Sequence, residues 1–257
     1  MNQHDKVQEQ FNKQAAIFSQ QPTIANPDYT QWILDHIELK PEDEVLDVAA
    51  GTGHLSRAIA PYVRQVTALD LTNSMIEQGH LETQQSGITN VHFEQGTAEN
   101  LPYPDASFDV AVTRFSLHHF ETPIAALREM NRVLKLGGRI AVIDLVSPDN
   151  PELAAAYNHF ERLRDPSHTT AFASNALINI VAEAGFDKVH GTARDIEVDL
   201  IRWLNLTQTP PEVQKLIQDN VGVELTGGKM TGMRPLRRDN TVMFLHRWMV
   251  VTGIKKS

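Results

Sequence analysis

The chain has 257 residues, of which 41 % are hydrophobic, and its formal net charge at pH 7 is −9. This length is typical of one large α/β domain, which buries enough apolar surface to fold without covalent cross-links. Because the chain has no cysteine, disulfide bonds, thiolate zinc sites and cysteine nucleophiles are excluded. The polar start and the lack of any run approaching about 18 apolar residues predict neither a signal peptide nor stable membrane insertion. We therefore expect a cytoplasmic protein.

Charge is distributed unevenly along the chain. Residues 229–257 hold seven Lys and Arg against one Asp, a net charge of +6, so residues 1–228 carry −15. The acidic balance argues against nucleic-acid binding, which needs a cationic surface to displace counterions. The basic end could be a solvated edge or a flap that recognises an anion.

Short apolar runs alternate with segments of helical period. Expected strands cover residues 44–49, 65–71, 91–96, 108–115, 138–146, 186–198 and 241–254. Expected helices cover residues 53–60, 74–87, 123–136 and 175–185, and residues 1–35 also have a helical pattern. This alternation predicts a single domain over residues 1–257, with a parallel sheet that is covered on both faces. The segments 147–173 and 200–240 are insertions of a size that usually forms lids or binding loops.

A glycine-rich loop follows the first expected strand, in the stretch Asp47-Val-Ala-Ala-Gly51-Thr-Gly53. Small residues let the backbone approach a ligand, and the N-terminus of the next helix offers free N–H groups to an anion. Asp70 ends the second expected strand, where a carboxylate can accept both hydroxyls of an adenosine ribose. Position 56 is Ser, so the third glycine of the dinucleotide fingerprint is absent. The loop and the acid predict a nucleoside site at the carboxyl ends of the strands; the alternative is a tight turn beside a solvated carboxylate.

Four stretches of the chain resemble the successive motifs of class I S-adenosylmethionine-dependent methyltransferases. They are LDVAAGTGHLS, ALDLTNSMIEQG, GTAENLPYPDASFDVAVTRFSLHHF and REMNRVLKLGGRIAVIDLV, which lie between about residues 40 and 146. The most similar subgroup is that of small-molecule enzymes related to the ubiquinone/menaquinone methyltransferases. The resemblance implies a Rossmann-like α/β fold: a mostly parallel sheet of seven strands with helices on both faces and an antiparallel last strand.

The resemblance also implies that S-adenosylmethionine is the cofactor and S-adenosylhomocysteine the product. Asp70 would hold the ribose, Leu71 and Met75 would lie beside the adenine, and Thr97 and Ala98 would bracket its ring. Many relatives have Asp in place of Thr97, so its hydroxyl or the N–H of Ala98 would have to recognise the adenine. The full set of expected cofactor-binding residues is Phe18, Asp47, Ala49, Gly51, Gly53, Asp70, Leu71, Met75, Thr97, Ala98, Glu99 and Arg114.

The segments around this core receive roles by the same resemblance. Residues 1–35, with Phe18, would form a helical lid over the cofactor. The insertions 147–173 and 200–240 would lie over the acceptor site.

The reaction that we expect is in-line methyl transfer to oxygen, carbon or nitrogen of a small organic acceptor. Alignment and desolvation supply much of the acceleration of such a transfer, and a general base is needed only if the acceptor must lose a proton. The fourth strand ends in Thr113-Arg-Phe-Ser116, without the Asn/Asp-Pro-Pro-Tyr/Phe tetrad of enzymes that methylate nucleobases or glutamine amides. Two alternatives are a non-catalytic cofactor-binding protein and an NAD-dependent oxidoreductase.

Seven residues are candidates for the acceptor site. His118 and His168 are the candidates for catalysis, because imidazole titrates near neutrality. The candidates for substrate binding are Arg114, His119, Asp165, Arg234 and Arg237. The arginines could bind a carboxylate or phosphate, which would make the acceptor anionic. Each residue also has a structural alternative: a packed ring, a surface arginine, a turn cap or a contact in a homodimer. We expect no metal, because adjacent histidines point in different directions and no carboxylates cluster with them.

Overall fold

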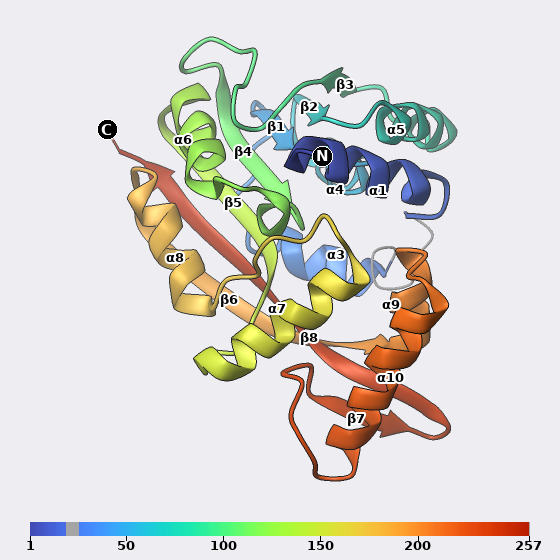
Figure 1. Cartoon of the computed structure of the whole chain (residues 1–257). Helices are drawn as coiled ribbons and strands as arrows, with labels where there is room; N and C mark the ends of the chain where they lie inside the picture. Colours follow the sequence, from blue (N-terminus) through green and yellow to red (C-terminus); the bar gives the residue numbers. More distant parts are fainter. Residues whose placement is uncertain (19–25, 257) are drawn as a thin grey trace.

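The computed structural model describes residues 1–18 and 26–256, which form one eight-stranded sheet. The strand order is β3-β2-β1-β4-β5-β8-β6, and β7 pairs with β8 (Figure 1). The first five strands run parallel, whereas β8 runs antiparallel to both β5 and β6. The strands are β1 Glu44–Val48, β2 Gln65–Asp70, β3 Val91–Gln95, β4 Phe108–Arg114, β5 Leu134–Val146, β6 Phe186–Asp199, β7 Pro235–Arg238 and β8 Thr241–Lys255.

Some of the helices begin after a residue whose side chain caps the helix N-terminus. The side chain of Asn150 accepts hydrogen bonds from the backbone N–H groups of Glu152 and Leu153, and that of Asp199 accepts one from Arg202 N. The α-helices are α1 Gln3–Phe18, α3 Pro27–Leu34, α4 His54–Ile59, α5 Asn73–Gln85, α6 Pro123–Val133, α7 Pro151–Arg164, α8 Ser174–Glu183, α9 Leu200–Leu206 and α10 Pro211–Leu225. Two 3₁₀ turns are η1 Ala60–Tyr62 and η2 Leu117–His119.

Alternating side chains of the central strands build a core on each face of the sheet. Leu46 of β1 belongs to the cluster under α6 and α8, and its neighbour Val45 belongs to the cluster under α3 and α4. A third apolar cluster joins α7, α9 and α10 to β6 and β8. The insertions therefore have a core of their own beside the carboxyl end of the sheet.

The α/β fold with a mostly parallel sheet is confirmed, with three corrections to the expected elements. The sheet has an eighth strand, β7, inside the segment expected as the insertion 200–240. That segment also contains α9 and α10, because Ile217 and Val221 bury one face of α10 against the third cluster. The helix expected to end at residue 136 ends at Val133, since Leu134 already pairs with Phe108.

No helix within the described ranges combines the length and the apolar composition that crossing a bilayer requires.

The turn between β1 and α4 depends on close packing at Gly53. This residue has a φ of 72°, and a Cβ atom built on it would lie 2.6 Å from the ring of Phe93 in β3. Gly87 has a similar φ of 69°, but no atom lies within 4 Å of its Cβ position. Both glycines thus need a positive φ, but only Gly53 is packed against a neighbouring side chain.

We expect Gly53→Ala to lower the free energy of unfolding by about 2–4 kcal/mol, because overpacking against Phe93 adds to the backbone strain. Gly87→Ala, the matched control, should lower it by only about 1 kcal/mol. Urea unfolding followed by circular dichroism measures both values. Equal losses in the two variants would mean that Phe93 moves aside without cost.

Candidate active site

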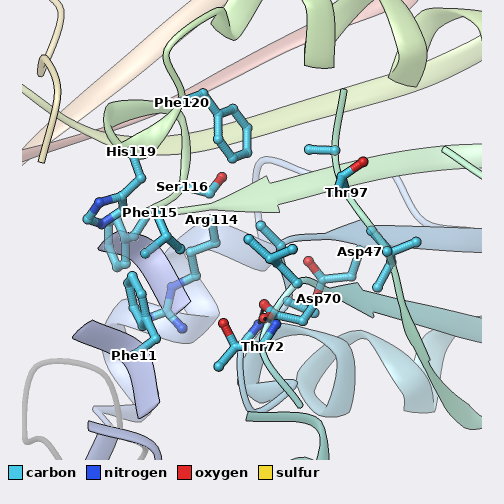
Figure 2. Close-up of a pocket in the computed structure, with 18 of the residues that line it drawn as sticks. Phe11, Asp47, Asp70, Thr72, Thr97, Arg114, Phe115, Ser116, His119 and Phe120 are labelled. Atoms are coloured by element: carbon cyan, nitrogen blue, oxygen red, sulfur yellow. Dashed lines mark hydrogen bonds between the residues drawn. The ribbon is translucent and has the colours of Figure 1, made fainter. Parts of the chain in front are cut away.

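A cavity of about 290 Å³ opens at the carboxyl ends of β1, β2 and β4 (Figure 2). Its wall consists of the loop after β1, the end of β2, residues 96–99, the end of β4 and part of α1. We call it the first cavity. Parallel strands bring their carboxyl ends to one edge of the sheet, so loops far apart in sequence converge here.

Asp70 joins two of these loops. Its Oδ2 accepts a hydrogen bond from Gly51 N at 2.7 Å, and its Oδ1 accepts one from Thr72 N at 2.8 Å. Burial raises the pKa of Asp70 above its ordinary value, and the two N–H groups oppose this rise. Each carboxylate oxygen keeps a second acceptor position, so Asp70 can also accept hydrogen bonds from a pair of hydroxyls.

Asp47 and Arg114 bring opposite charges to the same cavity. Asp47 Oδ2 accepts a hydrogen bond from Ser56 Oγ at 2.6 Å, whereas Oδ1 has no partner among the described residues. Burial raises the pKa of Asp47 to about 7 and lowers that of Arg114 to about 10. Arg114 Nε is also buried without a partner in the described part of the chain. Unpaired polar groups at a cavity wall suit a ligand that carries both an ammonium and a carboxylate group.

The backbone of the glycine-rich loop itself forms part of the wall. Ala49, Gly51 and Gly53 have φ values of 56°, 57° and 72°, which fold the loop tightly. A Cβ atom at Gly51 would already touch the ring of Phe18, at 4.0 Å. A larger side chain at this position would therefore occupy the ligand space.

Helix α1 contributes part of the wall of the first cavity. Phe11 and Phe18 of α1 line the cavity, and the side chain of Gln8 donates a hydrogen bond to Leu71 O at 3.1 Å. The helix is thus bonded to the segment that follows Asp70. The helical lid expected over residues 1–35 stays a prediction, and residues 19–25 of this segment lie outside the described residues.

A second cavity of about 220 Å³ adjoins the first. The two cavities share the wall residues Phe11, Phe18, Phe115 and His119. The remaining apolar wall consists of Leu145, Val198, Trp203, Leu206, Met243 and Trp248. Charged residues of both signs complete the wall, namely Arg164, Asp165, Glu197, Asp199 and Arg202. The second cavity is therefore mainly aromatic and aliphatic, with a charged portion.

The adjacent histidines at the end of β4 have opposite electrostatic environments. His118 Nδ1 lies 2.5 Å from Asp144 Oδ1. Burial lowers the pKa of His118, but the Asp144 carboxylate more than offsets this, so the pKa lies above its ordinary value. Burial and the nearby charge of His118 lower the pKa of His119 to about 4. His119 is thus neutral at pH 7, whereas the protonated form of His118 is favoured.

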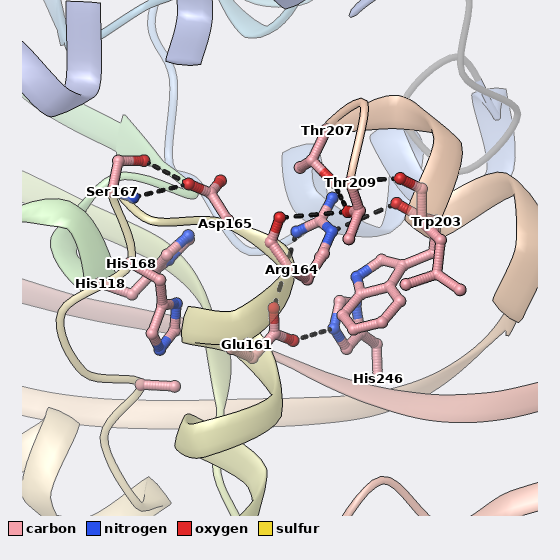
Figure 3. A network of polar contacts seen from close by, with 12 residues as sticks. His118, Glu161, Arg164, Asp165, Ser167, His168, Trp203, Thr207, Thr209 and His246 are labelled. Atoms are coloured by element: carbon pink, nitrogen blue, oxygen red, sulfur yellow. Dashed lines mark hydrogen bonds and ion pairs between the residues drawn. The ribbon is translucent and has the colours of Figure 1, made fainter. Parts of the chain in front are cut away.

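The hydrogen bonds of His119 fix its tautomer. Its Nδ1 lies 3.1 Å from Ser167 O and also 3.1 Å from Ser167 Oγ, and a carbonyl oxygen can only accept a hydrogen bond. Nδ1 therefore carries the proton, and Nε2 of the neutral ring has a free electron pair. Ser167 in turn donates its hydroxyl hydrogen to Asp165 Oδ1 at 2.6 Å, as Figure 3 shows.

A second buried network supports the charged part of the second cavity (Figure 3). His246 Nε2 lies 3.0 Å from Glu161 Oε1, and an Arg164 nitrogen lies 3.6 Å from Glu161 Oε2. Burial alone would raise the pKa of Glu161, but His246 and Arg164 hold it well below its ordinary range. The guanidinium of Arg164 also lies over the ring of Trp203, 4.7 Å from its centroid. These contacts fix the orientation of the Arg164 guanidinium group.

Most of the expected cofactor-binding residues line the first cavity. They are Phe18, Asp47, Ala49, Gly51, Asp70, Leu71, Thr97, Ala98, Glu99 and Arg114. Gly53 and Met75 do not line it, and their assignment to the cofactor stays a prediction. Gly53 faces Phe93, and Met75 is fully buried on the inner side of α5.

Only some of the residues expected at the acceptor site line one of the two cavities. His119 lines both cavities, and His118 and Asp165 line the second. His168 lines neither of these cavities of the described chain. Its Nε2 lies 2.8 Å from Asn158 Oδ1, which holds the ring away from both.

Arg234 and Arg237 also lie outside the walls of the two cavities, as the described residues form them. Arg234 makes a bidentate ion pair with Asp195, with both N–O distances at 2.9 Å. Arg237 belongs to the short strand β7. Their assignment to the acceptor site does not fit this geometry, because the hairpin of β7 and β8 extends away from the carboxyl ends of β1 and β4 (Figure 1).

Three contributors to the site escaped the sequence analysis. Phe115 and Trp248 line the second cavity, and Asp144 forms the ion pair with His118. For Asp144 a signal existed, because a carboxylate within the apolar strand Ala-Val-Ile-Asp-Leu-Val implies a buried partner. The two aromatic residues gave none, since ordinary core residues have the same pattern.

Comparison with known proteins agrees with this geometry. Residues 46–142 match the family model described as a methyltransferase domain. The uncharacterized methyltransferase YcgJ of Bacillus subtilis is 40 % identical over 249 residues, which covers 96 % of this chain and 98 % of that protein. The ubiquinone/menaquinone biosynthesis C-methyltransferase UbiE of Ectopseudomonas mendocina is 37 % identical over 164 residues, or 61 % of this chain and 64 % of UbiE. The crystal structure of B. subtilis YcgJ has a TM-score of 0.81 at 30 % identity and covers 90 % of this chain and 99 % of that one. The chain therefore belongs to the family of S-adenosylmethionine-dependent methyltransferases.

Proposed function

We propose that this protein transfers the methyl group of S-adenosylmethionine to an oxygen, carbon or nitrogen atom of a small organic acceptor bound in the second cavity. One observation carries the proposal: the two cavities share four wall residues, so molecules bound in the two cavities would lie next to each other at these side chains. Alignment of this kind is the main requirement of an in-line displacement.

The residues of the first cavity fit the cofactor. Asp70 would accept the ribose hydroxyls, the unpaired Oδ1 of Asp47 would accept from the ammonium group, and Arg114 would bind the carboxylate. Thr97 and Ala98 line the same cavity and would bracket the adenine ring. When bound, the cofactor supplies a methyl group that its sulfonium already activates.

The chain's own contribution is to orient the acceptor and to exclude water. Phe11, Phe18 and Phe115 surround the junction of the two cavities and leave little polar surface there. A dry junction strengthens electrostatic interactions and prevents competing hydrolysis.

His119 is the best placed base for an acceptor that must lose a proton. It lies at the junction, it is neutral at pH 7, and its Nε2 is free to accept a proton. His118, the residue favoured from sequence, fits this role less well because its pairing with Asp144 favours the protonated form. Asp165 would act through Ser167 to orient His119.

The second cavity suits a planar or aliphatic acceptor with an anionic substituent. Its wall is mainly apolar, and three of its acids are already bonded: Asp165 to Ser167, Glu197 to Arg238 and Asp199 to the N-terminus of α9. Arg202 has no ion-pair partner among the described residues and could bind the anion. Three expectations from the sequence stay predictions: that the protein does not bind nucleic acid, that it can form a homodimer, and that it is cytoplasmic.

Asp70→Ala should weaken binding of S-adenosylhomocysteine about 10- to 100-fold, because hydrogen bonds to a buried carboxylate are lost. Isothermal titration calorimetry measures the change, with Glu42→Ala on the surface as the control. Unchanged affinity in Asp70→Ala would remove the ribose site from this cavity.

Affinity for S-adenosylhomocysteine should rise as the pH is raised from about 5.5 to about 7.5, since the Asp47 carboxyl, with its pKa of about 7, must be ionised to pair with the ammonium group. The rise should approach tenfold per pH unit below that pKa. In Asp47→Asn the affinity for S-adenosylhomocysteine should be low and should not change over this pH range. A parallel pH dependence in both proteins would assign the effect to another group.

Leu206→Trp should fill the second cavity and abolish methyl transfer while the affinity for S-adenosylhomocysteine stays within about twofold of the parent value. Transfer is measured with radiolabelled S-adenosylmethionine and a panel of anionic and neutral aromatic acceptors. Leu216→Trp, on the exposed side of α10, serves as the control. Full turnover by Leu206→Trp would mean that the acceptor binds outside the second cavity. If the parent protein binds the cofactor but methylates none of the acceptors, the non-catalytic alternative is supported.

A further inference from the structure

Gln3, in the first turn of α1, bonds two segments that are distant in the sequence. Its Nε2 donates one hydrogen bond to His119 O at 2.8 Å and another to Ser167 O at 2.6 Å. Both partners are carbonyl oxygens, so the amide must present its nitrogen and not its oxygen to them. The side chain is buried, with 8 % of its surface exposed, and it also lines the first cavity.

The carbonyl of Ser167 is the same atom that fixes the tautomer of His119. It accepts hydrogen bonds from Gln3 Nε2 and from His119 Nδ1. Phe11, two turns further along α1, lies edge-on against the imidazole, with ring centroids 5.1 Å apart and an interplanar angle of 83° (Figure 2). Helix α1 therefore holds His119 in two ways, by a ring contact and through the carbonyl that orients the ring.

The other hydrogen bonds that dock α1 do not involve the histidine. The side chain of Gln8 donates to Leu71 O, and that of Gln10 donates to Thr207 O at 2.9 Å. Gln10 is as buried as Gln3, with 5 % exposure. Loss of the Gln10 bond would weaken docking of the helix without touching the surroundings of His119, which makes Gln10 a matched control.

We propose that Gln3 is a positioning residue that holds the Ser167 carbonyl against His119 Nδ1, so that the base at the junction of the cavities is complete only when α1 is docked. This inference rests on the proposed function, which assigns proton removal to His119. The proton would pass from the acceptor to His119 Nε2, and docking of α1 would both close the first cavity and prepare this nitrogen. An open enzyme would then hold a base that is not yet oriented.

Charged groups from η2, β5 and the end of α7 act on the pKa of His119, and they are His118, Asp144 and Asp165. The ring of His168 lies 6.5 Å from that of His119, and His4 of α1, which pairs with Glu99, lines the first cavity together with His119. None of them donates to or accepts from Ser167 O in the described structure. Substitution of Gln3 leaves all of these charges in place, so a change in His119 would report its orientation and its access to water.

The test needs no acceptor. Long-range ¹H–¹⁵N spectra of the histidine side chains, recorded with S-adenosylhomocysteine bound, distinguish the two tautomers, and His119→Gln assigns the signal. In the parent protein we expect the Nδ1–H tautomer of a ring that stays neutral to about pH 5, because its pKa is about 4. In Gln3→Met a mixture of tautomers should appear and the titration midpoint should fall below that of the parent, because the Ser167 carbonyl, which raises the pKa of His119, is no longer held against Nδ1–H. Gln10→Met should keep the parent spectrum.

Two outcomes would overturn the proposal. One is a parent-like His119 signal in Gln3→Met, and the other is an equal change in Gln10→Met, which would assign the effect to docking of α1 as a whole. If either variant loses affinity for S-adenosylhomocysteine, its spectra are compared at ligand saturation, where the helix is docked in both.

The proposed function is tested separately, once an acceptor is in hand. Gln3→Met should then lower kcat about tenfold with little change in KM, and the acidic limb of the pH–rate profile should shift with the NMR midpoint. If Gln3 controls the tautomer but His119→Gln retains full turnover, the positioning contact stands and the role of His119 as base is overturned.

Discussion

The wall of the first cavity depends on the carboxylate of Asp70 and its two hydrogen bonds to the backbone. The N–H of Gly51 belongs to the loop after β1, and that of Thr72 belongs to the loop after β2, so one side chain sets the spacing of both loops. Burial of the charge is costly, and the two N–H groups offset part of that cost. Because α1 is in turn bonded to Leu71 O, the position of this helix also depends on the segment that Asp70 holds.

Most of the wall of the first cavity could be predicted from the sequence, whereas most of the wall of the second could not. The reason is the geometry of the sheet. Asp47, Gly51 and Asp70 occupy the ends of neighbouring parallel strands, so their positions along the chain predict that they meet. The second cavity combines β5, β6, β8 and α9, and their meeting depends on strand order and on a third apolar cluster that no local pattern reveals. Met75 shows the same limit within one helix, since proximity to Asp70 does not say which side of α5 a residue occupies.

The histidine pair shows how the environment, and not the residue type, decides a chemical role. His118 and His119 are adjacent and both buried, yet the pKa of one is raised and that of the other is lowered. A carboxylate faces the first ring and a carbonyl faces the second, and a carbonyl stabilises the neutral Nδ1–H form without the full attraction that a carboxylate exerts on a cation. From the sequence, His118 and His168 were the candidates for catalysis and His119 was a candidate for substrate binding, because the sequence does not show which imidazole stays neutral.

The separate origin of the two cavity walls has an evolutionary consequence. The residues that fit the cofactor lie within 47–114, apart from those of α1, whereas Val198, Trp203, Met243 and Trp248 of the second cavity lie beyond the segment 46–142 that matches the methyltransferase family model. Mutations that reshape the second cavity can therefore arise in α9 and the outer strands without changing the residues proposed to bind the cofactor. On the proposed function, such a division would let one scaffold take different acceptors, with the shared aromatic junction as the element that both halves must preserve.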